Sequence, residues 1–86
     1  MAVTINGQCY RADKWGFGGF LLNANPADMP LGTLISIEGV GPNKKKPAPV
    51  SIRARVVRAG DDGACVALNF LHLDEDAFRV LGELSV

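Results

Sequence analysis

Residue types that carry out catalytic or metal chemistry are few and scattered in this chain. His72 is the only histidine, and Cys9 and Cys65 lack the close spacing of a zinc-binding pair. The carboxylates gather in turn and helix-capping positions, where solvation or capping accounts for them. We therefore expect no enzyme activity, no metal and no cofactor. We also expect each cysteine to be a small buried residue on a strand.

Cationic side chains are the second group that could do chemistry, since arginine donates paired hydrogen bonds to phosphates and carboxylates. Arg53 and Arg55 are separated by one residue, so on a strand they share one face and form a candidate interaction surface. An ion pair with Glu38 on a neighbouring strand is the other role open to them, and it is the role that we expect first. The lysine run 44–46 lies between prolines and indicates a solvated loop.

Segment 14–20, with the sequence KWGFGGF, combines aromatic residues with three glycines in four positions. Such glycines predict a turn with unusual backbone angles or a close approach of two backbones. The segment is not expected to cradle phosphate, because a strand and not a helix N-terminus follows it. Its aromatic residues resemble those of cold-shock barrels, which stack single-stranded nucleic acid, but the neutral charge of the chain favours a core-packing role.

Charge and composition limit the partners and the size of the fold. Nine basic residues balance nine acidic ones, so the chain has no overall positive field to attract nucleic acid or anionic lipid. With 86 residues, of which 48% are hydrophobic, the chain is expected to form one globular domain. The apolar runs are far shorter than the ~20 residues of a membrane helix, and the first residues lack the pattern of a secretory signal. We therefore expect no membrane segment and a cytoplasmic location.

The elements that must position these residues are short strands joined by turns. Alternating apolar residues predict strands near 3–5, 8–11, 19–23, 33–38, 50–56 and 64–70. Asn6-Gly7 and the DDG segment 61–63 have the residue types of hairpin turns. In strand 50–56 the alternation turns both arginines outward and sends four apolar residues to the core, namely Val50, Ile52, Ala54 and Val56.

The pattern changes after Asp74, where apolar residues recur every three or four positions. Ala77, Val80, Leu81 and Leu84 fall on one face of a helix, and acidic residues favour its first turn. Consecutive hairpins closed by a helix favour a barrel over a sandwich, because closure removes exposed strand edges. We therefore predict a single all-β domain over residues 1–86, built as a small antiparallel six-stranded β-barrel with one C-terminal α-helix.

Taken in order, four segments resemble a PilZ domain. They are segment 14–20, the Leu31-Gly32 pair before a strand, the strand ARVVR at 54–58, and the strand VALNF at 66–70 that leads to the helix. The resemblance covers nearly the whole chain. It implies a six-stranded barrel with a helix after the last strand, and a role in bacterial signalling, since many PilZ domains are receptors for cyclic di-GMP.

The ligand motifs of the PilZ family are only partly present. The family binds cyclic di-GMP through an RxxxR run before the barrel and a [D/N]xSxxG turn within it. No RxxxR occurs in this chain, and alignment of the turn on Gly19 puts Lys14 at the acidic position and Gly16 at the serine. The resemblance implies that a retained ligand site would consist of Arg11, Lys14, Trp15, Gly16 and Gly19.

These features lead to one main hypothesis and two alternatives. The resemblance implies a non-catalytic regulatory domain that acts through protein interaction, with cyclic di-GMP binding weakened or lost. PilZ domains occur in exopolysaccharide synthesis, motility and pilus proteins, which implies a partner from such machinery. One alternative is a cyclic di-GMP receptor with a rearranged site, in which Arg11, Arg53 or Arg55 replaces the missing arginine pair. The other is a cold-shock-like barrel that binds single-stranded nucleic acid.

Overall fold

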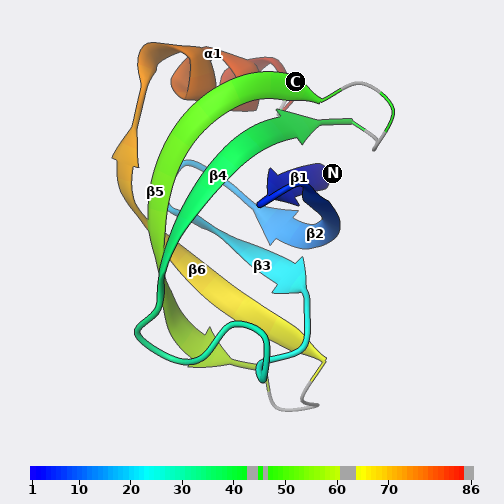
Figure 1. The fold of residues 1–86 in the computed structure, drawn as a ribbon. Coiled ribbons are helices and arrows are strands. Elements are labelled where there is room, and N and C mark those ends of the chain that lie inside the picture. Colours follow the sequence, from blue (N-terminus) through cyan, green and yellow to red (C-terminus); the bar gives the residue numbers. More distant parts are fainter. Residues whose placement is uncertain (43–44, 46, 61–63, 85–86) are drawn as a thin grey trace.

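The protein is a closed barrel of six antiparallel strands with one helix across its end (Figure 1). The computed structural model describes residues 1–42, 45, 47–60 and 64–84. Its elements are β1 (Ala2–Ile5), β2 (Gln8–Trp15), β3 (Gly19–Asn23), β4 (Leu34–Gly41), β5 (Ala48–Ala59), β6 (Cys65–Leu73) and α1 (Glu75–Leu84). The order around the barrel is β1-β2-β3-β6-β5-β4, and β4 pairs with β1 to close it. The predicted fold class is confirmed.

The first hairpin forms as its turn residues predict. Ile5 pairs with Gln8 across a two-residue loop, in which Asn6 and Gly7 have φ angles of 52° and 76°. Both angles lie in the left-handed region, which asparagine and glycine adopt at low cost and which matches the twist of the flanking strands. The turn therefore fixes the register of β1 against β2.

The alternation predicted for residues 50–56 is confirmed in β5. The apolar residues at alternate positions face the barrel interior, while Arg53 and Arg55 between them are exposed. The strand is longer than predicted and runs from Ala48 to Ala59, because it pairs with β4 on one side and with β6 on the other. The two arginines thus lie near the middle of a strand that is flanked on both sides.

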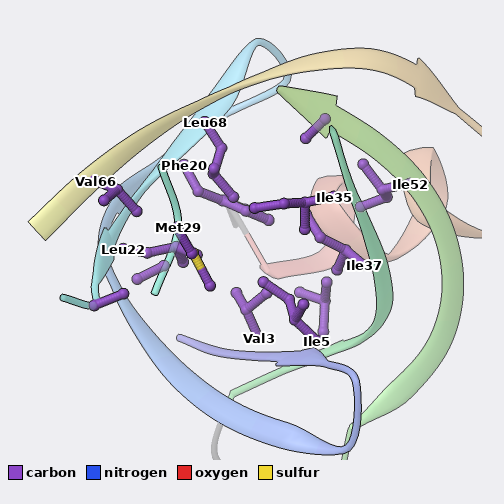
Figure 2. Close-up of a cluster of buried hydrophobic side chains, with 14 of the residues drawn as sticks. Val3, Ile5, Phe20, Leu22, Met29, Ile35, Ile37, Ile52, Val66 and Leu68 are labelled. Atoms are coloured by element: carbon purple, nitrogen blue, oxygen red, sulfur yellow. The ribbon is translucent and has the colours of Figure 1, made fainter. Parts of the chain in front are cut away.

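The barrel interior is filled by apolar side chains from all six strands (Figure 2). Phe20 and Phe70 pack edge to face with ring centroids 4.7 Å apart, an arrangement that the charge distribution of aromatic rings favours. Other members are almost completely buried, among them Val3, Leu22, Ile37, Ile52 and Val66. Among the described residues no polar or charged side chain is buried. Candidate binding chemistry must therefore be sought on the outer surface.

The helix α1 covers one end of the barrel, as its apolar spacing predicts (Figure 1). Ala77, Val80 and Leu81 are buried, and the helix contacts β4, β5 and β6. The Asp74 carboxylate accepts a hydrogen bond from the backbone N–H of Ala77 at 2.8 Å, so Asp74 caps the helix N-terminus. The Asp74 N–H donates to the carbonyl oxygen of Ser51 at 3.2 Å. This bond ties the start of the helix to β5.

The cysteines differ from the expectation that both are buried. Cys9 is exposed on β2, and Cys65 is only half-buried on β6. The expectation is wrong for Cys9 because the hairpin register pairs it with Thr4 and turns both side chains to the outside of the barrel. The predicted turn at 61–63 and part of the lysine run 44–46 lie outside the described residues.

Candidate functional site

The exposed arginines of β5 lie in a shallow depression on the outer face of β4, β5 and β6. The strand register places Ser36 and His72 on either side of Arg53, and Leu34 opposite Arg55. Residues that lie directly opposite in antiparallel strands project from the same face of the sheet. The depression has a volume of about 470 Å³ and is lined by Leu34, Ile35, Ser36, Arg53, Arg55, Leu71 and His72. We refer to it below as the arginine depression.

Two exposed leucines form the apolar part of the arginine depression. Leu34 is 64% exposed and Leu71 is 52% exposed. Leu34 faces outward because it alternates with the buried Ile35 along β4. Leu71 faces outward because Val66, Leu68 and Phe70 take the inward positions of β6. The β5–β6 register shifts next to Leu71, and this bulge turns His72 outward as well, opposite Arg53. The depression therefore combines arginines with large apolar side chains that the core does not use.

The charges of the arginine depression are not neutralised within the described residues. The ion pairs found there lie elsewhere, on β2 and on α1. The predicted pairing of the arginines with Glu38 is wrong, because the register puts Ser36 and not Glu38 opposite Arg53. Within the described part of the chain, no carboxylate lines the depression. The guanidinium donors of Arg53 and Arg55 are thus available for an anionic group of a ligand or partner.

The side chains that line the arginine depression are suited to binding. In the part of the chain that the structure describes, no group of three or more His, Cys, Asp and Glu residues could hold a metal ion. His72 and Ser36 both line the depression, but Arg53 lies between them on the middle strand, so they are two strand spacings or roughly 10 Å apart, too far for a nucleophile and its base. Arginines beside apolar groups are typical of binding sites, because the planar guanidinium group binds carboxylates or phosphates while the aliphatic stem packs on apolar surface.

The glycine-rich turn between β2 and β3 holds most residues of the ligand site that the PilZ resemblance implies. Lys14 is exposed, whereas Trp15 is half-buried, pairs with Phe20 and packs against the core. Gly16 lies in the turn, and its N–H donates to the Gly19 carbonyl oxygen at 3.2 Å. Lys14 and Trp15 therefore point to opposite sides of the sheet and do not form one binding surface.

Gly19 provides the close backbone approach that the glycines predict. A Cβ at this position would collide with the Leu68 carbonyl oxygen on β6. The neighbouring Gly18 carbonyl accepts a hydrogen bond from the Phe70 N–H at 2.9 Å. The core-packing role predicted for the aromatic residues of this segment holds for Trp15 and Phe20 but not for Phe17, which is 47% exposed.

Arg11 lies apart from the other cationic residues of interest. Its guanidinium group forms an ion pair with Asp13, with Nη2 2.9 Å from Oδ1. Arg11 pairs with Asn23 of β3, and both β3 and β6 separate β2 from β5. The structure therefore brings Arg53 and Arg55 together but does not bring Arg11 to them.

Comparisons with protein-family models, with curated proteins and with solved structures find no match to this chain. Among the described residues, no helix has both the length and the apolar character needed to span a bilayer. The arginine depression and the glycine-rich turn are therefore the features that bear on function.

Sequence reasoning identified the two arginines but missed the residues around them. Leu34 could have been found, because period two along β4 puts it on the same face as Ser36. Leu71 could have been found in the same way, because it alternates with the inward Leu68 and Phe70, whereas no residue type signals the register shift of β5 against β6 that follows it. His72 was considered only as a metal ligand, and its place beside Arg53 follows from the same register shift.

Proposed function

We propose that this chain is a non-catalytic regulatory domain of the PilZ type that acts through contact with another protein. The arginine depression is the contact surface, and Arg53 and Arg55 are its main donors. In this proposal cyclic di-GMP binding is lost, and the domain works in the bacterial cytoplasm. The resemblance to PilZ domains suggests a partner from exopolysaccharide, motility or pilus machinery.

One observation carries the proposal, namely two unpaired arginines in a depression flanked by exposed leucines. Arginine and large apolar residues concentrate at the centres of protein interfaces, where the apolar groups exclude water from the charged contacts. A purely structural role would account for neither feature, because the arginines have no ion-pair partner among the described residues and the leucines do not belong to the core.

The assignment to the PilZ type has support from the order of elements. The resemblance implies a six-stranded barrel followed by a helix, and the chain has this arrangement. The glycine of segment 14–20 that aligns with the end of the family's turn is Gly19, where the barrel tolerates no side chain. A fold can host many functions, so the fold supports the type of domain and the surface supports the mode of action.

The loss of cyclic di-GMP binding is proposed because, among the described residues, no group of cations converges on the glycine-rich turn. A ligand with two phosphates needs several donors within reach of one another. Arg11 is engaged by Asp13. β2 and β5, which carry Arg11 and Arg53, are three strand spacings apart in either direction around the six-stranded barrel, so the two exposed arginines project from opposite walls.

Isothermal titration calorimetry with cyclic di-GMP tests this part of the proposal. We expect no heat beyond dilution at ligand concentrations up to ~1 mM. Micromolar binding would overturn the proposed loss and favour a rearranged receptor site. In that case Arg11→Ala and the double variant Arg53→Ala/Arg55→Ala would show which cations replace the missing arginine pair.

The contact surface is tested by charge reversal with a matched control. Arg53→Glu/Arg55→Glu changes the arginine depression, while Arg58→Glu changes an exposed arginine of the same strand that does not line it. A cross-linked partner that Arg58→Glu retains and the double variant loses supports the proposal. A partner held equally by all variants would place the contact elsewhere and overturn it.

A further inference from the structure

One edge of β4 has no neighbouring strand along its first residues. β1 is short, and its register with β4 ends where Thr4 pairs with Gly39 (Figure 1). On the other side, β4 pairs with β5 from Leu34 onward. Residues 34–37 are therefore paired on one side only, over a length of roughly 13 Å at ~3.3 Å per residue. A strand edge of this kind presents main-chain groups that can pair with another chain.

The hydrogen bonds at the start of β4 show which main-chain groups face the open edge. The Val56 N–H donates to the Thr33 carbonyl oxygen at 3.0 Å, so the Thr33 carbonyl faces β5. Residues of an antiparallel strand face one neighbour and the other in alternation, so Leu34 and Ser36 turn their N–H and C=O groups away from β5. In the described part of the chain, no turn or loop forms a main-chain hydrogen bond with these groups. They are thus available for pairing.

A cavity of about 440 Å³ opens beside this edge, in the place that a longer β1 would occupy. It is bounded by the start of β4, by the hairpin tip with Ile5 and Asn6, and by the loop that precedes β4. Ile5, Met29 and Ile35 are buried and form its apolar floor (Figure 2). The cavity can therefore receive a side chain from a segment that pairs with β4.

Asp28 gives this cavity its charge. It is the one charged side chain among the described residues that line the cavity, and it has no ion-pair partner among them. A turn fixes its main chain, since the Asp28 N–H donates to the Asn25 carbonyl oxygen at 2.9 Å. A side chain with an aliphatic stem and a cationic end matches this lining, because the stem packs on the apolar floor while the charge faces the carboxylate.

We propose that the open edge of β4 pairs with an extended segment of a partner protein, and that a basic residue of this segment enters the cavity. The segment lies next to β4 where β1 does not reach, and its main chain pairs with the N–H and C=O groups of Leu34 and Ser36. The stem of the basic residue packs on the apolar floor, and its charge faces Asp28. In strand addition of this kind, main-chain hydrogen bonds give affinity and the side-chain pocket gives specificity.

The inference rests on the proposed function in one respect, the use of this side of the barrel for protein contact. Leu34 and Ser36 line both the cavity and the arginine depression, so the two surfaces are continuous across the start of β4. One partner can therefore cover both surfaces, with an anionic group on the arginines and an extended basic segment at the edge.

NMR titration of the isotope-labelled protein with a short peptide tests the proposal. The probe is the capped pentapeptide Val-Thr-Lys-Thr-Val, whose β-branched residues favour an extended strand. We expect the amide signals of Leu34 and Ser36 to shift and their hydrogen exchange to slow, because both N–H groups become donors to the peptide. Norleucine in place of the peptide lysine, and Asp28→Asn in the protein, should each weaken binding about two- to fivefold. Unchanged signals at Leu34 and Ser36, or equal binding of the lysine and norleucine peptides, would overturn the inference.

Two substitutions at one position separate main-chain pairing from side-chain contact. Ser36→Pro removes an N–H that β5 does not use, and strand edges tolerate proline, whereas Ser36→Ala removes only the hydroxyl. Ser36→Pro should weaken peptide binding by about tenfold or more, and Ser36→Ala should bind like the unchanged protein. Circular dichroism confirms the fold, and Leu34→Pro, at the first residue of β4, serves if Ser36→Pro does not fold. Equal binding by the proline and alanine variants would overturn the inference. The cross-linking result for Arg53 and Arg55 does not depend on this outcome.

Discussion

At the scale of single residues, Gly19 leaves the least room for a side chain. A Cβ there would meet the Leu68 carbonyl oxygen, which is backbone and can move only if the pairing of β3 with β6 is disturbed. Gly19→Ala should therefore lower the free energy of unfolding by about 1–3 kcal/mol. Gly18→Ala is the control, because nothing lies within 4 Å of a Cβ at Gly18. Urea denaturation of both variants provides the comparison, and equal losses would contradict the close approach.

Asp74 shows how one side chain determines where an element begins. Its carboxylate accepts the Ala77 N–H, one of the donors that the first turn of a helix leaves without a helical partner. Asp74→Ala should cost about 1 kcal/mol of stability, whereas Asp74→Asn keeps an acceptor and should cost less. Thermal unfolding followed by circular dichroism measures both variants. A cost that is the same for alanine and asparagine would show that the hydrogen bond does not stabilise the helix.

At the scale of elements, the bulges of β5 and β6 decide which side chains reach the surface. Val57 faces outward because it alternates with the buried Val56, and the β5–β6 register shift between Val56 and Arg58 turns Arg58 outward as well. Val56 is 1% exposed and the adjacent Val57 is 49% exposed. This pair of neighbouring, chemically identical residues is a direct test of the register.

Val56→Ala should lower the free energy of unfolding by about 2 kcal/mol, because it leaves a cavity in the barrel interior. Val57→Ala should change the free energy of unfolding by no more than about 0.5 kcal/mol, since it removes an exposed side chain. Chemical denaturation of the two variants under the same conditions distinguishes these effects. The reverse order of stabilities would mean that the strand is turned by one residue.

The same register shifts limit which side-chain orientations can be predicted from the sequence. Period-two alternation was sufficient for β5, because Ile52, Ala54 and Val56 are strictly buried. Helical spacing was sufficient for α1, where Ala77 and Leu81 are buried. A bulge adds a residue without a distinctive residue type, so the outward position of His72 beside Arg53 could not be predicted, and neither could the complete lining of the arginine depression.

Contacts between elements distant in the sequence set the remaining limit. The stacking of Phe17 on Phe78 joins the β2–β3 turn to α1, and four strands lie between them in the sequence. Alternation within one segment carries no information about such a contact. Arg11 belongs to the ligand site that the family resemblance implies. In the barrel, however, two strands lie between β2, which carries Arg11, and β5, which carries Arg53. Local patterns therefore gave the elements, while closure of the barrel determined which residues meet.

At the scale of the whole molecule, the apolar interior confines binding to the outer surface, and the neutral charge limits what binds there. Nine basic and nine acidic residues leave no net field to concentrate a polyanion. Proteins that bind single strands without sequence preference combine a positive groove with exposed aromatic rings on which bases stack. Trp15, which a cold-shock-like role would require to be exposed, is instead half-buried and packs against the core.

The single tryptophan makes this difference measurable. Addition of a single-stranded oligonucleotide at low salt should leave the fluorescence of Trp15 unchanged, because the ring is not available for stacking and the attraction to phosphates is weak. Acrylamide, a small neutral quencher, provides the positive control, since it should partly quench a half-buried ring. Quenching by the oligonucleotide that disappears as salt is raised would identify the barrel as a nucleic-acid binder, and it would then place the binding surface at the β2–β3 turn rather than at the arginine depression.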